Sequence, residues 1–413
     1  MSFTNILKSA VIAAVSLQLF SGISLAESPK YTVDSSNYMQ YADKLTEGQM
    51  KTFESYPDYK INVYETSAEC RLPDAVRAVS QTNSKMVNGN EGIEWGTLGA
   101  KPFPNPTHAQ HYIWNHRSAP HYNASIHRTL VAYIVKSDGT STIGKGDNYI
   151  EFPQALTSPL RGTIDPNLYA LYMVKNMSPA RIAGTLTMLH DFYDAAVQPR
   201  KAWQYSPATR RVRRAPDVNY DSFVDQTGGL ATIDSYNMFT GAQDRFDWTL
   251  EGEKTMLVPH ANYALSEVGA KDKILSSRHF VDPSLYRYEE RNVVIVKATL
   301  KEGSRHIFPK QMMYVATDEH NGIMIRDHYD GQGSLAKHQI GSRRVDSSGV
   351  CQFNGEQTID FATRSFVIQN TLGPGHDDLE LEYDVINMGM NFYSPDGLRP
   401  VSYTHLRAHE TKA

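Results

Sequence analysis

Five histidines lie within twenty residues of one another, and the imidazole of histidine is a common ligand of metal ions. They are His108, His111, His116, His121 and His127. His108 and His111 are three residues apart, so they would share one face of a helix. The run contains no Asp, Glu or Cys, whereas a zinc site needs a fixed ligand set with outer hydrogen-bond partners. Ordinary surface and core histidines are the simpler interpretation, and we predict no metal site and no cofactor.

Asp244 and Asp247 are the carboxylates that could act in general acid/base chemistry, since Arg245 and Trp248 lie beside them. The simpler interpretation is structural, with Arg245 paired to a carboxylate and Trp248 anchoring a sheet. The sequence contains no Gly-x-Ser-x-Gly elbow, no Gly-x-Gly-x-x-Gly turn, no phosphate-binding loop and no His-Glu-x-x-His motif. We therefore expect a binding protein and no enzyme. A hydrolase or isomerase acting on an exported hydrophobic substrate is the alternative.

Arginines are concentrated at Arg210-Arg211-Val212-Arg213-Arg214. On a strand, Arg211 and Arg213 would share one face. Guanidinium groups bind phosphate and carboxylate, so Arg211, Arg213 and Arg245 are candidates for contact with a lipid headgroup or an acidic partner. The alternative is a charged edge strand that resists aggregation. The formal net charge of −4 gives no indication of nucleic-acid binding.

Apolar residues on expected strands are candidates to line a hydrophobic ligand site. The chain has 14 methionines, whose flexible side chains adapt to irregular apolar shapes. Ordinary core packing is the alternative for each of them. The candidates are Met173, Ile182, Leu186, Met188, Trp203, Trp248, Val294 and Met313.

Strands joined by short turns must position these side chains. Residues 286–300, 306–316 and 323–329 read as three strands, and turns this short force antiparallel pairing. Further hairpins flank residues 137–139, 176–179 and 206–209, and strands are expected over 246–258 and 357–370. We predict a mainly β (α+β) fold with a large curved antiparallel sheet, of the barrel, half-barrel or sandwich kind.

Few helices are expected. Thr46 and Gln49 have capping-box spacing and predict a helix that ends near Ser55. Others are expected after Pro73, over residues 108–116 and over residues 233–239.

The two ends of the chain differ from its centre. Residues 1–26 carry Lys8, an apolar run and a Ser-Leu-Ala ending, which predicts a cleavable secretory signal; an uncleaved anchor is the alternative. Residues 401–413 resemble a translated sequencing adapter; a genuine polar tail is the alternative. Residues 27–400 are expected to form a single domain with an N-terminal helical extension. Cys70 and Cys351 would form a disulfide in an exported protein, with two buried thiols as the alternative.

Several segments resemble an exported bacterial family, a domain of unknown function related to the outer-membrane lipoprotein-sorting proteins of the LolA/LolB-like superfamily. They cover about residues 45 to 340, and are Leu45–Gln49 with Tyr56-Pro57, Pro102–Pro104 with Trp114–His116, Trp203–Tyr205, Arg210–Pro216, Phe239–Trp248 and Arg287–Glu289 through Tyr329–Gly331. The resemblance implies a half-barrel whose concave face is filled or covered by helices, and whose cavity takes acyl chains. It also implies a periplasmic place, peripheral to the outer membrane, beside an inner-membrane exporter of the resistance-nodulation-division type.

We therefore expect a periplasmic carrier or binding protein for a lipid, lipoprotein or other hydrophobic molecule. A structural accessory subunit of a transporter is a further alternative.

Overall fold

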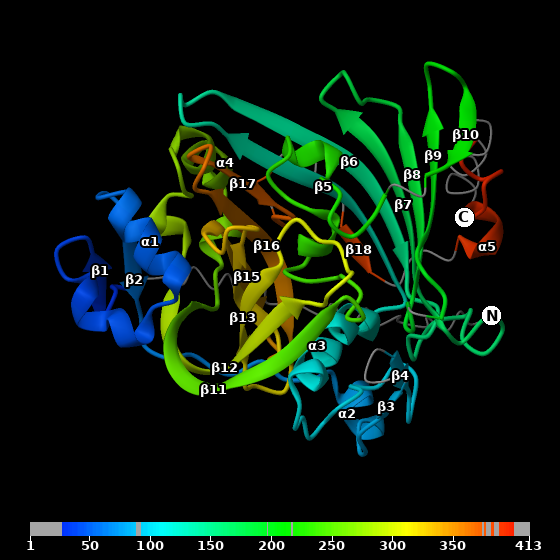
Figure 1. The fold of residues 1–413 in the computed structure, drawn as a ribbon, viewed down its shortest axis with the longest axis horizontal. Helices are drawn as coiled ribbons and strands as arrows, with labels where there is room; N and C mark the ends of the chain where they lie inside the picture. Colours follow the sequence, from blue (N-terminus) through cyan, green and yellow to red (C-terminus); the bar gives the residue numbers. More distant parts are fainter. Residues whose placement is uncertain are drawn as a thin grey trace, which may run out of the picture.

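One large curved sheet dominates the computed structural model (Figure 1). The structure describes residues 27–87, 92–195, 197–215, 218–373, 376, 381–383 and 388–399, so the expected signal segment 1–26 and the adapter-like segment 401–413 lie outside it. The sheet has 16 strands in the order β1-β2-β12-β13-β14-β15-β16-β17-β5-β6-β7-β8-β9-β10, with β11 paired to β12 and β18 paired to β5. The order starts at β1 and ends at β10, so the sheet is open.

The strands of the sheet are β1 (Tyr31–Asp34), β2 (Lys60–Val63), β5 (Ser125–Val135), β6 (Ser141–Glu151), β7 (Leu168–Ser178), β8 (Leu186–Phe192), β9 (Lys201–Ser206), β10 (Arg211–Arg214), β11 (Phe246–Pro259), β12 (Tyr288–Leu300), β13 (Lys310–Ala316), β14 (Ile323–Tyr329), β15 (Leu335–Val345), β16 (Cys351–Asp360), β17 (Ser365–Gln369) and β18 (Leu381–Tyr383). A separate hairpin joins β3 (Lys85–Val87) to β4 (Gly92–Glu94). The helices are α1 (Glu47–Ser55), α2 (Asp74–Val79), α3 (Ala109–Ser118), α4 (Ala270–Ser276) and α5 (Gly389–Phe392).

The expected fold class is confirmed. Neighbouring strands pair antiparallel, apart from a single parallel contact between β2 and β12. The capping box of α1 is present, because Gln49 N–H donates to Thr46 Oγ1 and Thr46 N–H donates to Gln49 Oε1. Within the described residues, no helix has the length and apolar character needed to cross a membrane.

Three local expectations are wrong. The helix expected over 233–239 stops at Ser235, since Asn237 and Met238 have φ of 48° and 66° and leave the helical region. Residues 357–370 belong to two strands, β16 and β17, because the chain turns between them at Arg364 (φ 54°). The hairpin turn expected at 176–179 lies at residues 179–185, because β7 continues to Ser178. Proline ends the strand there, as it has no N–H to donate to the ladder.

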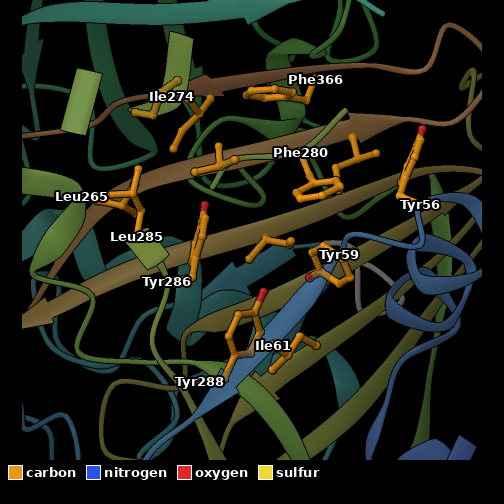
Figure 2. Packing of buried hydrophobic residues seen from close by; sticks show 14 of the residues in the cluster. Tyr56, Tyr59, Ile61, Leu265, Ile274, Phe280, Leu285, Tyr286, Tyr288 and Phe366 are labelled. Atoms are coloured by element: carbon orange, nitrogen blue, oxygen red, sulfur yellow. The ribbon is translucent and has the colours of Figure 1, made fainter. Parts of the chain in front are cut away.

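Each strand contributes alternate side chains to an outer and an inner face. The outer face carries the largest apolar core, in which α1, α4 and residues 264–286 cover outer-face residues of β5 and β15–β17. Figure 2 shows part of this core, with the rings of Tyr56 and Tyr59 lying around Phe280. Farther along the sheet, α5 and the residues up to Leu398 cover the outer face of β7–β9. The outer face is therefore filled by the protein itself.

The inner face is covered by two different pieces of chain. Helix α3 packs with Tyr112 and Ile113 against β12 and β13. Residues 218–240, which we call the roof segment, lie over β5, β6 and β17, with Leu230 and Ala231 packed on Val367. The roof touches β6 closely, since a Cβ at Gly144 would lie 2.3 Å from the carbonyl oxygen of Gln226. Glycine at this position is what permits the approach.

Buried polar side chains of β14 and β15 tie the roof segment to the sheet. Arg326 Nη2 donates to Asp234 Oδ2 at 2.6 Å, and its Nη1 donates to the Met238 carbonyl oxygen at 2.7 Å. Lys337 Nζ donates to the carbonyl oxygen of Leu230 at 2.7 Å, and Gln339 Nε2 donates to that of Ser235 at 2.6 Å. Burial alone would raise the pKa of Asp234, but the charge of Arg326 holds that pKa well below its usual range.

The structure joins Cys70 and Cys351 in a disulfide across a sequence separation of 281 residues. Cys351 begins β16, and the neighbouring backbone is also bound, since Arg71 N–H donates to the carbonyl oxygen of Gly349 at 2.9 Å. The bridge thus fastens the loop before α2 to the first residue of β16, an interior strand of the sheet.

Removal of the disulfide should lower the stability of the fold. A loop of this length contributes at most about 6 kcal/mol in the chain-entropy model of disulfides. Cys70→Ser, Cys351→Ser and the double variant should therefore lower the urea midpoint by the same amount, because either single change removes the bridge. Urea unfolding followed by circular dichroism measures this. An oxidised wild type that unfolds at the same urea concentration as the double variant would contradict the prediction.

Replacement of Arg326 should release the roof segment. Arg326→Met leaves the buried Asp234 carboxylate without its guanidinium partner and with the His306 ring at 3.3 Å, and breaking a buried pair in this way costs about 3–5 kcal/mol. Urea unfolding of the variant should show this loss, and amide hydrogen exchange should rise in residues 230–240. A matched change at an exposed arginine of the same sheet, Arg211→Met, should leave both measurements unaltered. Equal stability of Arg326→Met and wild type would show that the pair does not hold the roof.

Candidate functional site

Two adjacent cavities lie between the inner face of the sheet and the segments that cover it. The first, cavity A, has a volume of about 240 Å³ and lies between β7–β10 and the roof segment. Val174 of β7 and Leu189 of β8 form its floor, and Phe223, Val224 and Ile233 of the roof lie opposite. Its walls are therefore largely apolar, which suits the hydrocarbon part of a ligand.

Two arginines lie at the polar parts of cavity A. Arg200 is buried and forms two hydrogen bonds of 2.5 Å with the carboxylate of Asp191, while its guanidinium lies 4.0 Å from the ring centre of Tyr220. Its charge is therefore already balanced. Arg213 is exposed, and its Nη2 donates to Gln204 Oε1 at 3.2 Å. Because its partner is a neutral amide, Arg213 keeps an unbalanced positive charge beside the cavity.

The second space, cavity B, has a volume of about 350 Å³. It is lined by residues of β5–β7, by the C-terminal end of α3, and by β15 and β16. Cys351 of the disulfide belongs to this lining. Tyr172, Tyr236 and Thr240 line both cavities, so A and B meet at these side chains. Cavity B is more polar than cavity A, and its lining includes His116, Tyr122, Arg128, His320, Arg343 and Asp346.

The ionisable groups around cavity B are mostly neutral or positive. Burial lowers the pKa of His116 to about 3 and takes that of His320 well below its usual value, so both rings are neutral at pH 7. Burial raises the pKa of Glu356 to about 8, which keeps this carboxyl mainly protonated beside Arg128. Asp346 is the one acidic residue among the described side chains that line cavity B. Its Oδ1 accepts hydrogen bonds from the backbone N–H groups of Ser348 and Val350.

Five of the apolar residues singled out from the sequence lie away from both cavities. Met173, Leu186, Met188 and Trp203 point to the outer face, where they pack in a cluster with Phe392, Tyr393 and Leu398. Ile182 lies in the turn between β7 and β8, so the expectation that it lies on a strand is wrong. Neither cavity receives these side chains.

Val294, Met313 and Trp248 do point to the inner face, but beneath α3. Val294 and Met313 are buried with Tyr112 and Ile113, so the helix occupies the place that a ligand would take. Trp248 lies at the edge of this cluster, and its Nε1 donates to the carbonyl oxygen of Gln243 at 2.9 Å.

The charged candidates are also separated from one another. Of the three arginines Arg211, Arg213 and Arg245, Arg213 alone lines cavity A. Arg245 Nη1 lies 3.9 Å from Asp221 Oδ1, beside a small cavity of about 80 Å³ that Asp244 also lines. Asp247 is exposed on β11 and lines neither cavity A nor cavity B.

The histidine run does not converge on one point. His111 stacks on Phe103 and His127 on Tyr149, whereas His116 Nε2 donates to the Asn237 carbonyl oxygen at 2.7 Å. The side chain of His121 lies outside the described residues. Within the part of the chain that the structure describes, Cys70, His260 and Cys351 are the one group close enough to hold a metal ion, and its two sulfurs are bonded to each other.

Apart from Arg213, the residues that line cavity A were not identified as candidates from the sequence. Tyr172, Val174 and Leu189 alternate with Met173 and Met188 on the same two strands. The alternation was visible, and it defines two faces for each strand. It does not show which face residues 388–399 cover and which face stays open.

Comparison with known proteins gives similar structures and one clear relative. A protein from Desulfovibrio piger, of the DUF1329 family, aligns with 71% of this chain and 100% of its own at 16% identity, with a TM-score of 0.47. The LolA superfamily protein NE2245 from Nitrosomonas europaea aligns with 71% of this chain and 100% of its own at 10% identity, with a TM-score of 0.44.

A curated relative is more similar in sequence than these solved structures are. Uncharacterized protein PA3922 of Pseudomonas aeruginosa is 36% identical over 319 residues, which cover 75% of this chain and 68% of that protein. A family profile matches residues 32–399, which confirms the family resemblance seen in the sequence. The chain belongs to the family described as "Protein of unknown function (DUF1329)".

Proposed function

We propose that this protein is a periplasmic carrier or binding protein whose ligand is a hydrophobic molecule held in cavity A. The observation that carries the proposal is the unfilled space on the inner face. Strands β12 and β13 are covered there by α3, whereas Val174 and Leu189 of β7 and β8 face cavity A. Because the apolar core lies on the outer face and the cavity on the inner face, a ligand can bind without disrupting the core.

The walls of cavity A favour an apolar guest. Removing apolar surface from water stabilises by roughly 25 cal/mol per Å², so covering about 300 Å² of an acyl chain would contribute on the order of 7 kcal/mol before the ordering costs. The roof segment contributes to this contact through Phe223, Val224 and Ile233. Anchoring of the roof by Arg326 therefore supports binding indirectly, by keeping these side chains over the floor.

Binding is favoured over catalysis by the placement of the candidate acids. Asp247 is exposed on β11, and Asp244 lines a separate cavity of about 80 Å³. Neither carboxylate lines cavity A or cavity B. A general base must come within hydrogen-bond reach of the substrate, so a hydrolase or isomerase would need other residues.

The periplasmic place of action rests on the predicted secretory signal and the disulfide between Cys70 and Cys351. Transfer of the ligand to or from an inner-membrane exporter of the resistance-nodulation-division type is part of the same proposal, and it rests on the family resemblance alone.

Filling cavity A should abolish binding without unfolding the protein. Val174→Trp places an indole in the cavity, and Met177→Trp is the matched control, because Met177 lies on the same strand but is half exposed and lines neither cavity. Wild type and Met177→Trp should bind cis-parinaric acid or its methyl ester saturably, and Val174→Trp should bind at least about tenfold more weakly, a loss of 1.4 kcal/mol or more. Ligand fluorescence measures the affinity, and urea unfolding checks each fold.

Thr187→Phe, on β8, provides a second way to fill the same space if Val174→Trp does not fold. Failure of wild type to bind either probe, or equal binding by a folded Val174→Trp or Thr187→Phe variant, would contradict the proposed function.

A further inference from the structure

Arg343 on β15 is a buried cation in an unusual position. The residue is only 3% exposed, and it lines cavity B. The guanidinium lies across the backbone of Gly322, where a Cβ would fall 1.2 Å from Nη2. The space for the guanidinium therefore exists because residue 322 is glycine.

The guanidinium of Arg343 has no partner in the described part of the chain. No hydrogen bond or ion pair reaches its side chain there, and its Nη1 is buried and unsatisfied. Burial lowers the pKa of Arg343, and the charge of Asp318 offsets this only in part. The Asp318 carboxylate is committed elsewhere, as its Oδ1 accepts hydrogen bonds from the backbone N–H groups of His320 and Asn321.

Two other buried arginines on the inner face show what a satisfied site looks like. Arg326 donates to Asp234, to Gln311 and to two backbone carbonyl oxygens. Arg200 forms two hydrogen bonds with Asp191. A buried charge without a counter-charge is among the most costly features in a protein interior, so Arg343 stands apart from both.

Asp346 lines the same cavity and the charge of Asp318 acts on Arg343, but neither carboxylate forms an ion pair with its guanidinium in the described part of the chain. The nearby rings of His116 and His320 are neutral, and Nδ1 of His320 is buried and unsatisfied. Arg128 adds a second positive charge to the lining of cavity B. The oxygens of a carboxylate or phosphate would satisfy Arg343, since guanidinium groups bind such oxygens with paired hydrogen bonds.

We infer that cavity B binds the acidic head group, a carboxylate or phosphate, of an amphiphile whose apolar tail passes Tyr172 and Tyr236 into cavity A, with Arg343 as the counter-ion of the head. This inference rests on the proposed function and defines its ligand class. Arg343 is chosen over Arg200 because Arg200 is already paired with Asp191, and over Arg213 because Arg213 is exposed to water.

The test compares an acid with its neutral ester in wild type and Arg343→Met. Cis-parinaric acid and its methyl ester have the same tail, so their affinity ratio reports the head group. Wild type should prefer the acid by about tenfold or more, the effect of a hydrogen bond to a charged group. Arg343→Met should lose this preference and still bind the ester, because methionine has no charge to offer.

Stability without ligand separates this role from a structural one. Ligand-free Arg343→Met should unfold at the same temperature as wild type or a higher one, because the change removes an unpartnered buried charge. Arg326→Met is the matched control and should unfold at a lower temperature, because Arg326 is fully paired. A clear drop in the unfolding temperature of Arg343→Met would overturn the inference.

The remaining outcomes are also decisive. Equal affinity of wild type for acid and ester would overturn the acidic-head assignment but leave the proposed function intact, whereas binding of neither probe would remove both.

Inorganic phosphate alone distinguishes a free anion from an amphiphile. A phosphate-induced rise in unfolding temperature as large as that caused by the fatty acid would show that cavity B takes a free anion, and would overturn the amphiphile. No such rise with phosphate, beside a rise with the acid, supports it.

Discussion

The ion pair between Arg326 and Asp234 is the interaction on which the inner side of this protein depends. It joins the middle strands of the sheet to the roof segment 218–240, and the same guanidinium also binds the carbonyl oxygens of Asp234 and Met238. A curved sheet alone would present its concave face to water. With the roof segment fastened at Asp234, that face becomes a wall of two cavities. Buried pairs often add little net stability, so we interpret this one as fixing the position of the roof.

The unequal covering of the two faces explains where a ligand can bind. The outer face is filled by α1, α4 and residues 388–399. In the core that Figure 2 shows, aromatic side chains pack against one another. The inner face is filled beside β12 and β13 by α3, but beside β7–β10 cavity A lies between the sheet and the roof segment. The position of the cavities is therefore determined by the segments that pack over the sheet, and not by the strands themselves.

This division also explains how much the sequence could predict. The antiparallel strands, the Thr46–Gln49 capping box and α3 follow from local patterns, and the structure confirms them. The ligand site does not follow from such patterns, because Val174 and Met173 are neighbours with similar apolar character, and their roles differ through a contact with residues far away in the chain. Arg343 gives no signal either. Its lack of a partner is a property of the folded environment, since the same sequence places a well-paired arginine at position 326.

A crystal structure with a bromine-labelled fatty acid tests the central claim most directly, because anomalous scattering locates the bromine without assumptions about the rest of the ligand. Our account predicts a bromine peak between Val174 and Leu189 under the roof segment, with the carboxylate beside the guanidinium of Arg343. A peak among Met173, Met188 and Trp203 on the outer face, or a saturated crystal with both cavities filled only by solvent, would contradict it.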